Sequence, residues 1–117
     1  MEKIVEQGLL YDFYGELLTE HQRQIYEGIV YENLSLAEIA AEHGISRQGV
    51  HDIVKRCDKA LMGYEDKLKL IDRFMKIKER IQEMEKLSEQ YEQSENLDKA
   101  VYCRKIRRKA SEILEEL

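Results

Sequence analysis

The side chains with the clearest chemical potential in this sequence are polar and basic residues suited to contact with nucleic acid. Arg47 and Gln48 are residue types that pair with the edges of guanine and adenine. Lys55, Arg56 and Lys59 follow in the same stretch, and such cations commonly contact phosphates. The candidate nucleic-acid-binding residues are therefore Ser46, Arg47, Gln48, His51, Lys55, Arg56 and Lys59.

Patterns typical of catalytic and metal sites do not occur in the sequence. His21, His43 and His51 lack the spacing of metal-binding histidines, and there is no glycine-rich phosphate loop or nucleophile elbow. Cys57 and Cys103 lie far apart, so we expect two small buried side chains in a reducing cytoplasm. We predict a non-enzymatic protein without metal or cofactor. An enzyme is the third hypothesis, supported only by a surplus of acidic residues and tyrosines.

The elements that position the basic residues are two helices joined by a sharp turn. Ser35 and Glu38 form a capping box that opens a helix expected to end at about residue 43. Gly44 supplies the left-handed backbone that ends a helix, and Ser46 caps the next helix, which starts at Arg47. This is the helix-turn-helix pattern, in which the second helix enters the major groove of DNA.

The same pattern also serves for packing or protein contact alone, and the sequence leaves this alternative open. Asp52 and Asp58 favour it, because carboxylates on the second helix repel phosphate. Gly49 favours it too, since it leaves a gap where a side chain could contact a base.

Two amphipathic helices are expected before the motif. Apolar residues spaced by three and four predict one over residues 4–18, and Thr19 caps a second that fades near residues 32–33. The tyrosines here lie on or beside the apolar stripes, so we expect them to pack rather than to stack on bases; they are Tyr11, Tyr14, Tyr26 and Tyr31.

After the motif, the sequence predicts a helical extension. An apolar heptad seam predicts either one helix from Arg47 to about Tyr91 or a break near Gly63. A polar turn at residues 93–96 and a last helix to residue 117 complete a hairpin. We therefore expect a helix-turn-helix bundle over residues 1–62 and a helical extension over 63–117. The hairpin has more apolar surface than two helices cover, so we expect a homodimer.

Composition supports an all-α fold. The chain has 117 residues, of which 37% are charged, with no proline and 6 glycines. No apolar run is long enough to cross a membrane, and the first residues lack a signal-peptide pattern, so we expect a cytoplasmic protein. The net charge of −5 argues against nucleic acid, but residues 1–44 carry −7 and residues 45–80 carry +4. The basic stretch begins at the predicted second helix.

Residues Leu18 to Leu61 resemble region 4 of the bacterial sigma factors. The matching segments are L-T-E-H-Q-R, S-L-A-E-I-A and G-I-S-R-Q-G-V-H-D-I-V-K-R. The opening L-L-Y-D-F-Y-G-E-L-L-T, the charged tail and the length resemble the YlxM family. That family comprises small bacterial helix-turn-helix proteins associated with the signal recognition particle.

The resemblance implies a non-enzymatic regulatory or adaptor protein of the signal recognition particle pathway. Its partner would be the GTPase or the RNA of the particle. A transcriptional regulator that binds DNA is the alternative. No other sigma region is present in the sequence, so promoter recognition within the polymerase is not implied. The sigma-like positions are Ser46, Arg47, Gln48, Val50, His51 and Arg56.

Overall fold

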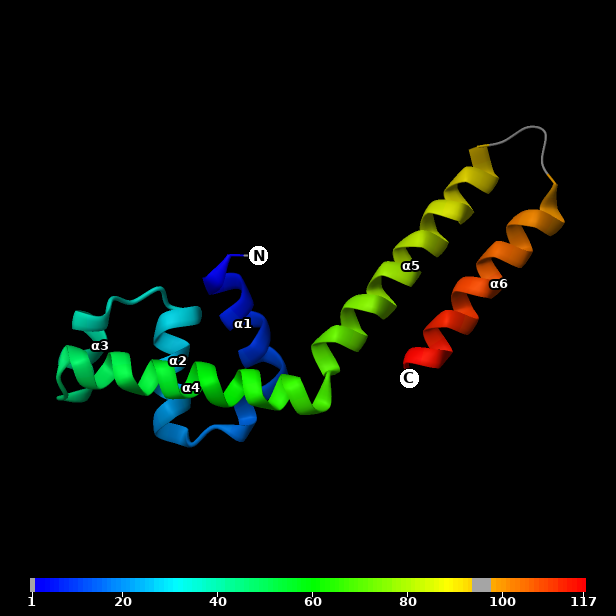
Figure 1. The fold of residues 1–117 in the computed structure, drawn as a ribbon. Coiled ribbons are helices and arrows are strands. Elements are labelled where there is room, and N and C mark those ends of the chain that lie inside the picture. The colour runs from blue at the N-terminus through cyan, green and yellow to red at the C-terminus, as the bar shows by residue number, and fades with distance from the viewer. Residues whose placement is uncertain (1, 94–97) are drawn as a thin grey trace. The chain divides into compact units, whose positions relative to one another are not determined.

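The computed structural model describes residues 2–93 and 98–117, which fold into helices and short connections, as predicted for an all-α protein. The elements are α1 (Lys3–Tyr14), the 3-10 turn η1 (Gly15–Leu17), α2 (Glu20–Val30), α3 (Leu36–His43), α4 (Arg47–Leu68), α5 (Leu70–Gln93) and α6 (Lys99–Glu116) (Figure 1). They form two compact units, which divide between Ile71 and Asp72.

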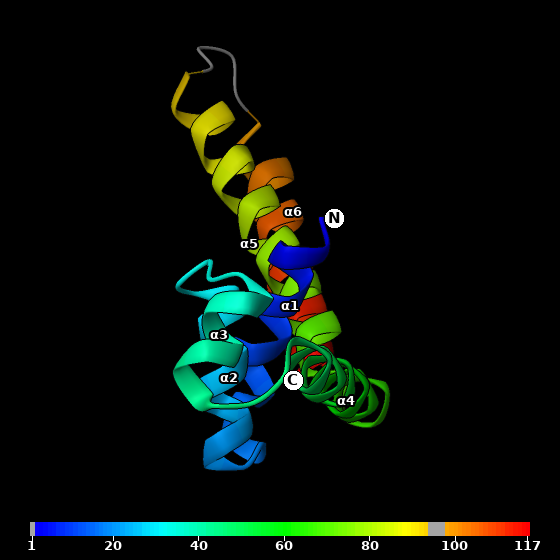
Figure 2. The ribbon, with the colours of Figure 1, turned by 90° about the vertical axis from the view of Figure 1, so that its left-hand side faces the viewer.

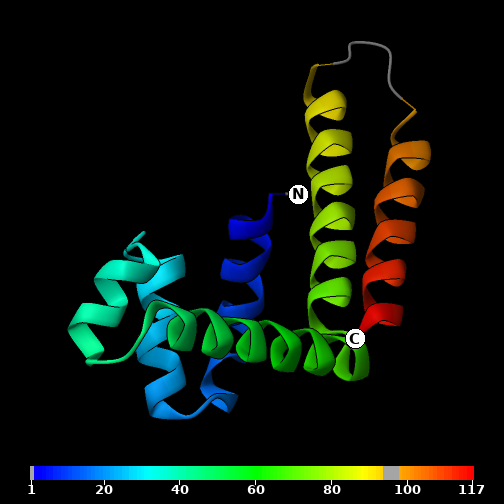
Figure 3. The same cartoon turned by 60° about the vertical axis from the view of Figure 1, so that its left-hand side comes forward.

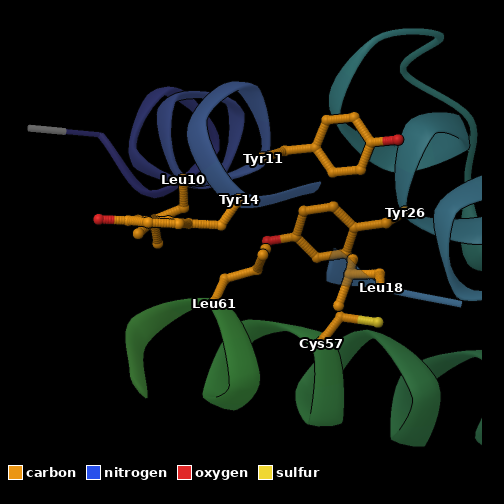
Figure 4. Close-up of a cluster of buried hydrophobic side chains, with 7 residues drawn as sticks. All are labelled: Leu10, Tyr11, Tyr14, Leu18, Tyr26, Cys57 and Leu61. Carbon is orange, nitrogen blue, oxygen red and sulfur yellow. The ribbon is translucent and has the colours of Figure 1, made fainter. Parts of the chain in front are cut away.

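In the first unit, α4 is the helix on which α1, α2 and α3 pack (Figures 2 and 3). One cluster of buried side chains joins α1 and α2 to α4, and Figure 4 shows those of Cys57 and Leu61 pointing from α4 toward the side chains of α1 and α2. A second cluster joins α2 and α3 to α4. The first comprises Leu10, Tyr11, Tyr14, Leu18, Tyr26, Cys57 and Leu61, and the second comprises Ile25, Ile39, Ala40 and Val50.

Three tyrosines combine burial in this core with a hydrogen bond to a carboxylate on another helix. Tyr11 of α1 donates to Glu27 of α2, Tyr14 donates to Glu65 of α4, and Tyr26 donates to Asp58 of α4. The packing predicted for these three tyrosines is therefore confirmed. The prediction was only partly right for Tyr31, whose side chain is 56% exposed and donates to Asp12.

The end of α4 differs from both alternatives that the sequence offered. Gly63 lies inside the helix, which continues to Leu68 and ends at Lys69 in a left-handed conformation with φ 58°. Beyond it, the Tyr14 hydroxyl accepts a hydrogen bond from the Leu70 N–H, and the Glu65 carboxylate accepts one from the Ile71 N–H. These acceptors satisfy the first amides of α5. The break and the division into units therefore come later than the expected boundary after residue 62.

The second unit is an antiparallel hairpin of α5 and α6. Arg80 and Lys109 form ion pairs across it, to Glu112 at 2.8 Å and to Glu83 at 2.7 Å respectively. Tyr91 and Tyr102 meet edge to face farther along the hairpin, with ring centroids 6.1 Å apart. Of the predicted polar turn, residues 94–96 lie outside the described residues.

The two cysteines lie in different environments. Cys57 is fully buried, and desolvation raises the pKa of its thiol to about 11. Cys103 is exposed on α6, so its predicted burial was wrong. Ile81, Leu114 and Leu117 are also exposed in the second unit. Coverage of this unit by a second copy of the chain stays a prediction.

Candidate nucleic-acid interface

The helix-turn-helix is closed by the local hydrogen bonds that the sequence predicts. The Ser35 hydroxyl accepts from the Glu38 N–H and the Glu38 carboxylate accepts from the Ser35 N–H, both at 3.1 Å. Gly44 ends α3 with φ 66°, and the Ser46 hydroxyl accepts from the Gly49 N–H at 2.9 Å. These bonds place the first turn of α4 directly after the turn of the motif.

Gly49 has a local structural role rather than leaving an unfilled gap. A Cβ at this position would lie 3.1 Å from the Ser46 hydroxyl oxygen. That separation is short for a carbon beside a capping oxygen, so a larger residue would require the Ser46 side chain to shift by a few tenths of an ångström. Glycine at this position therefore leaves the Ser46 cap undisturbed.

The structure brings the seven predicted residues together on one helix and its N-cap. The buried residues of α4 are Val50, Cys57 and Leu61, which occupy the face that packs on the bundle. At 100° per residue, Gln48, Lys55, Arg56 and Lys59 occupy the opposite half of the helix and His51 lies at its edge, while Arg47 in the first turn lies about 60° from the buried face. Six of the seven are exposed and His51 is half-buried; the six are Ser46, Arg47, Gln48, Lys55, Arg56 and Lys59. We refer to these residues as the polar face of α4, and their role as a binding site stays a prediction.

The two aspartates of α4 have different surroundings. Asp58 is turned to the bundle, where it accepts hydrogen bonds from the Tyr26 hydroxyl at 2.5 Å and from the Gln7 amide at 2.9 Å. Desolvation and the bond to Asp58 raise the pKa of Tyr26. Asp52 is exposed and accepts from the Gln48 amide at 2.9 Å. Only one of the two carboxylates that argued against phosphate binding therefore lies on the polar face.

A shallow groove lies where the first turn of α4 meets α3. It is lined by Arg47, Gln48 and His51 of α4 and by Leu36 of α3. Leu36 was not among the predicted site residues, because its apolar type and its place in α3 predict packing alone. The groove offers guanidinium and amide donors beside an apolar side chain, a combination that can contact a base edge and a thymine methyl group.

Two other kinds of site find no support in the part of the chain that the structure describes. No three of the His, Cys, Asp and Glu side chains in residues 2–93 and 98–117 are placed to hold a metal ion. No helix within those residues is long and apolar enough to cross a membrane.

Comparison with known proteins identifies the family. A family model described as "Putative helix-turn-helix protein, YlxM / p13 like" (UPF0122) matches residues 1–102. The chain belongs to this family. A UPF0122 protein of Clostridium botulinum is 45% identical over 96 residues, which cover 81% of this chain and 88% of the relative. A UPF0122 protein of Clostridium kluyveri is 48% identical over 79 residues, which cover 68% of this chain and 71% of the relative.

A third UPF0122 protein, from Desulforamulus reducens, is 40% identical over 95 residues, which cover 81% of each chain. Family membership confirms the resemblance that the sequence motifs indicated, and with it the helix-turn-helix. The family description and the names of these relatives specify no substrate, target sequence or partner.

The different roles of the two aspartates predict different effects on stability. Asp58→Ala leaves the wholly buried Tyr26 hydroxyl without its acceptor, which costs about 1–3 kcal/mol of unfolding free energy. Asp52→Ala, on the exposed face, changes it by less than about 0.5 kcal/mol. Urea unfolding followed by circular dichroism measures both. Equal losses in the two variants would show that Asp58 does not organise the bundle.

Proposed function

We propose that this protein is a regulator that binds duplex DNA by placing α4 in the major groove. The observation that carries the proposal is the outward face of α4. It presents Arg47, Lys55, Arg56 and Lys59 to solvent while Asp58 is turned to the bundle. In the described residues, none of these four cations is within ion-pair distance of a carboxylate.

The length of this face suits the major groove. Arg47 and Lys59 are twelve residues apart, so they span about 18 Å of helix at 1.5 Å per residue. In a helix-turn-helix complex the first residues of the second helix contact base edges. Arg47 and Gln48 stand at that end, and the lysines farther along contact phosphates. Gln48 must exchange its bond to Asp52 for a bond to a base.

The same geometry disfavours double-stranded RNA as the ligand of α4. The major groove of B-form DNA is about 12 Å wide and admits an α-helix. The major groove of A-form RNA is deep and narrow, and side chains cannot read it. A helix whose outward face is the binding surface is therefore better matched to B-form DNA.

Binding to a mixed-sequence duplex tests the proposal. We expect Arg47→Ala with Lys55→Ala to weaken binding at least tenfold. The slope of log affinity against log salt should decrease by about one for each phosphate that the variant no longer neutralises. Lys3→Ala with Lys67→Ala is the matched control, because it removes two exposed charges of the same unit outside residues 46–59. Equal affinity of the two variants would contradict the proposal.

Association with the signal recognition particle is a second candidate function. The chain belongs to the YlxM-like family that the opening segment and the motif indicated. The resemblance to that family, which implies an association with the particle, supports this candidate. In this candidate the protein is an adaptor or regulator, and its partner is the GTPase or the RNA of the particle.

Affinity capture from the native cell, with and without nuclease, tests this second candidate. We expect the particle's GTPase or RNA to be recovered. Loss of the GTPase after nuclease treatment would place the contact on RNA, and its retention would place the contact on protein. A capture that recovers neither component contradicts the candidate. The Arg47→Ala, Lys55→Ala variant serves as a second bait and shows whether α4 makes the contact.

A further inference from the structure

A second cationic site lies in the hairpin and uses none of the residues assigned to DNA binding. A groove of about 340 Å³ runs between α5 and α6. Its charged lining consists of Lys86 from α5, of Lys105, Arg108 and Lys109 from α6, and of a single acid, Glu83. Leu87 contributes an apolar side chain to the lining.

The sequence of α6 explains the charge. Residues 99–111 contain six basic side chains and no acidic one. Elsewhere in the hairpin, Lys76 is paired along the helix with Asp72 at 3.2 Å. Within the described residues, no carboxylate lies within ion-pair distance of Lys86, Lys105 or Arg108.

The one acid of the groove does not neutralise these three cations. Glu83 pairs with Lys109 at 2.7 Å and with Arg80 at 3.3 Å. The hydrogen bond from Lys109 is the main cause that lowers the pKa of Glu83. The negative charge of Glu83 is therefore already paired with Lys109 and Arg80. The groove therefore keeps three uncompensated positive charges, contributed by both helices.

We propose that this groove binds the phosphate backbone of single-stranded nucleic acid. Phosphate is favoured because a guanidinium such as Arg108 presents a planar fork of donors that matches two phosphate oxygens, and the lysines add point charges. A single strand is favoured over a duplex by size. The axes of two packed helices lie about 8–10 Å apart, and the groove between them is too narrow for a double helix.

The neighbouring groups suit a strand more than an isolated phosphate. Three cations along one groove match a ligand with repeated charges, the pattern by which proteins follow a nucleic-acid backbone. Leu87 gives a base an apolar surface to pack against. The proposal uses only the second unit and goes beyond the binding of DNA by α4.

The test is binding of a labelled 15-nucleotide single strand of mixed sequence, in DNA and RNA forms. The groove variant is Lys86→Gln, Lys105→Gln, Arg108→Gln. The control variant, Arg73→Gln, Lys78→Gln, Lys99→Gln, removes three exposed charges of the same unit outside the groove. We expect the groove variant to bind at least tenfold more weakly and the control to stay within twofold of the natural chain.

The salt dependence should change as well. Each phosphate that a protein neutralises on a single strand contributes about 0.7 to the slope of log affinity against log salt, so the slope for the groove variant should be smaller by about 2. Equal affinities of groove and control variants would overturn the proposal, as would an absence of single-strand binding by the natural chain. A competition experiment adds a further check, in which polyglutamate or unlabelled single strand displaces the labelled strand. If both displace it at the same concentration of negative charge, the proposal is overturned in favour of an acidic protein partner.

The Arg47→Ala, Lys55→Ala variant separates this proposal from DNA binding by α4. It should keep single-strand binding and lose duplex binding. A groove variant that loses single-strand binding upholds the groove even if the α4 variant binds duplex normally. If instead the α4 variant loses duplex binding while the groove variant binds the single strand normally, DNA binding by α4 is upheld and the groove proposal is overturned. Circular dichroism of each variant verifies that the helices are intact.

Discussion

The hydrogen bonds that Asp58 accepts act together with the apolar packing of α4 to fix which side of this helix is turned to solvent. Tyr26 of α2 and Gln7 of α1 donate to this one carboxylate, so three helices meet at it. A buried hydroxyl that loses its acceptor is costly, and this cost opposes rotation of α4 about its axis. In this orientation, α4 buries Val50, Cys57 and Leu61 and exposes its basic residues. The candidate interface therefore depends on a contact in the core.

A second contact of the same chemistry determines where α4 ends. Tyr14 donates a hydrogen bond to Glu65. The Tyr14 hydroxyl accepts one from the backbone amide of Leu70, and the Glu65 carboxylate accepts one from that of Ile71. The chain can therefore leave the helix at Lys69 without exposing unpaired amides to the apolar core. In both cases a tyrosine supplies apolar surface and one polar atom, and a carboxylate of α4 satisfies that atom.

The parts of this structure that could be predicted from sequence are those determined by near neighbours. The capping box of Ser35 and Glu38 and the cap of Ser46 act over three residues, so the motif and its polar face follow from local pattern. The inward turn of Asp58 could not be predicted, because its partners lie 32 and 51 residues away. The end of α4 at Lys69 could not be predicted either, because the next residue, Leu70, donates its backbone hydrogen bond to Tyr14, 56 residues away.

The charge of the chain illustrates the same limit. The total of −5 is the charge of the first unit, since residues 1–71 sum to −5 and residues 72–117 sum to zero. It does not show that cations outnumber acids on α4 and α6, or that several acids are bound by tyrosines or by lysines. An acid that is hydrogen-bonded in the core contributes to the sum but does not lie at the interface. Sign and position have to be considered together before a net charge says anything about partners.

The central claim is that the outward face of α4 is the surface that contacts duplex DNA. Titration of the ¹⁵N-labelled protein with a B-form duplex, followed by amide chemical shifts, tests it most directly. The account predicts that the largest shifts lie between Ser46 and Lys59 and that the amides of α1 change little. Shifts confined to α1 and α2, with α4 unchanged at saturation, would contradict it.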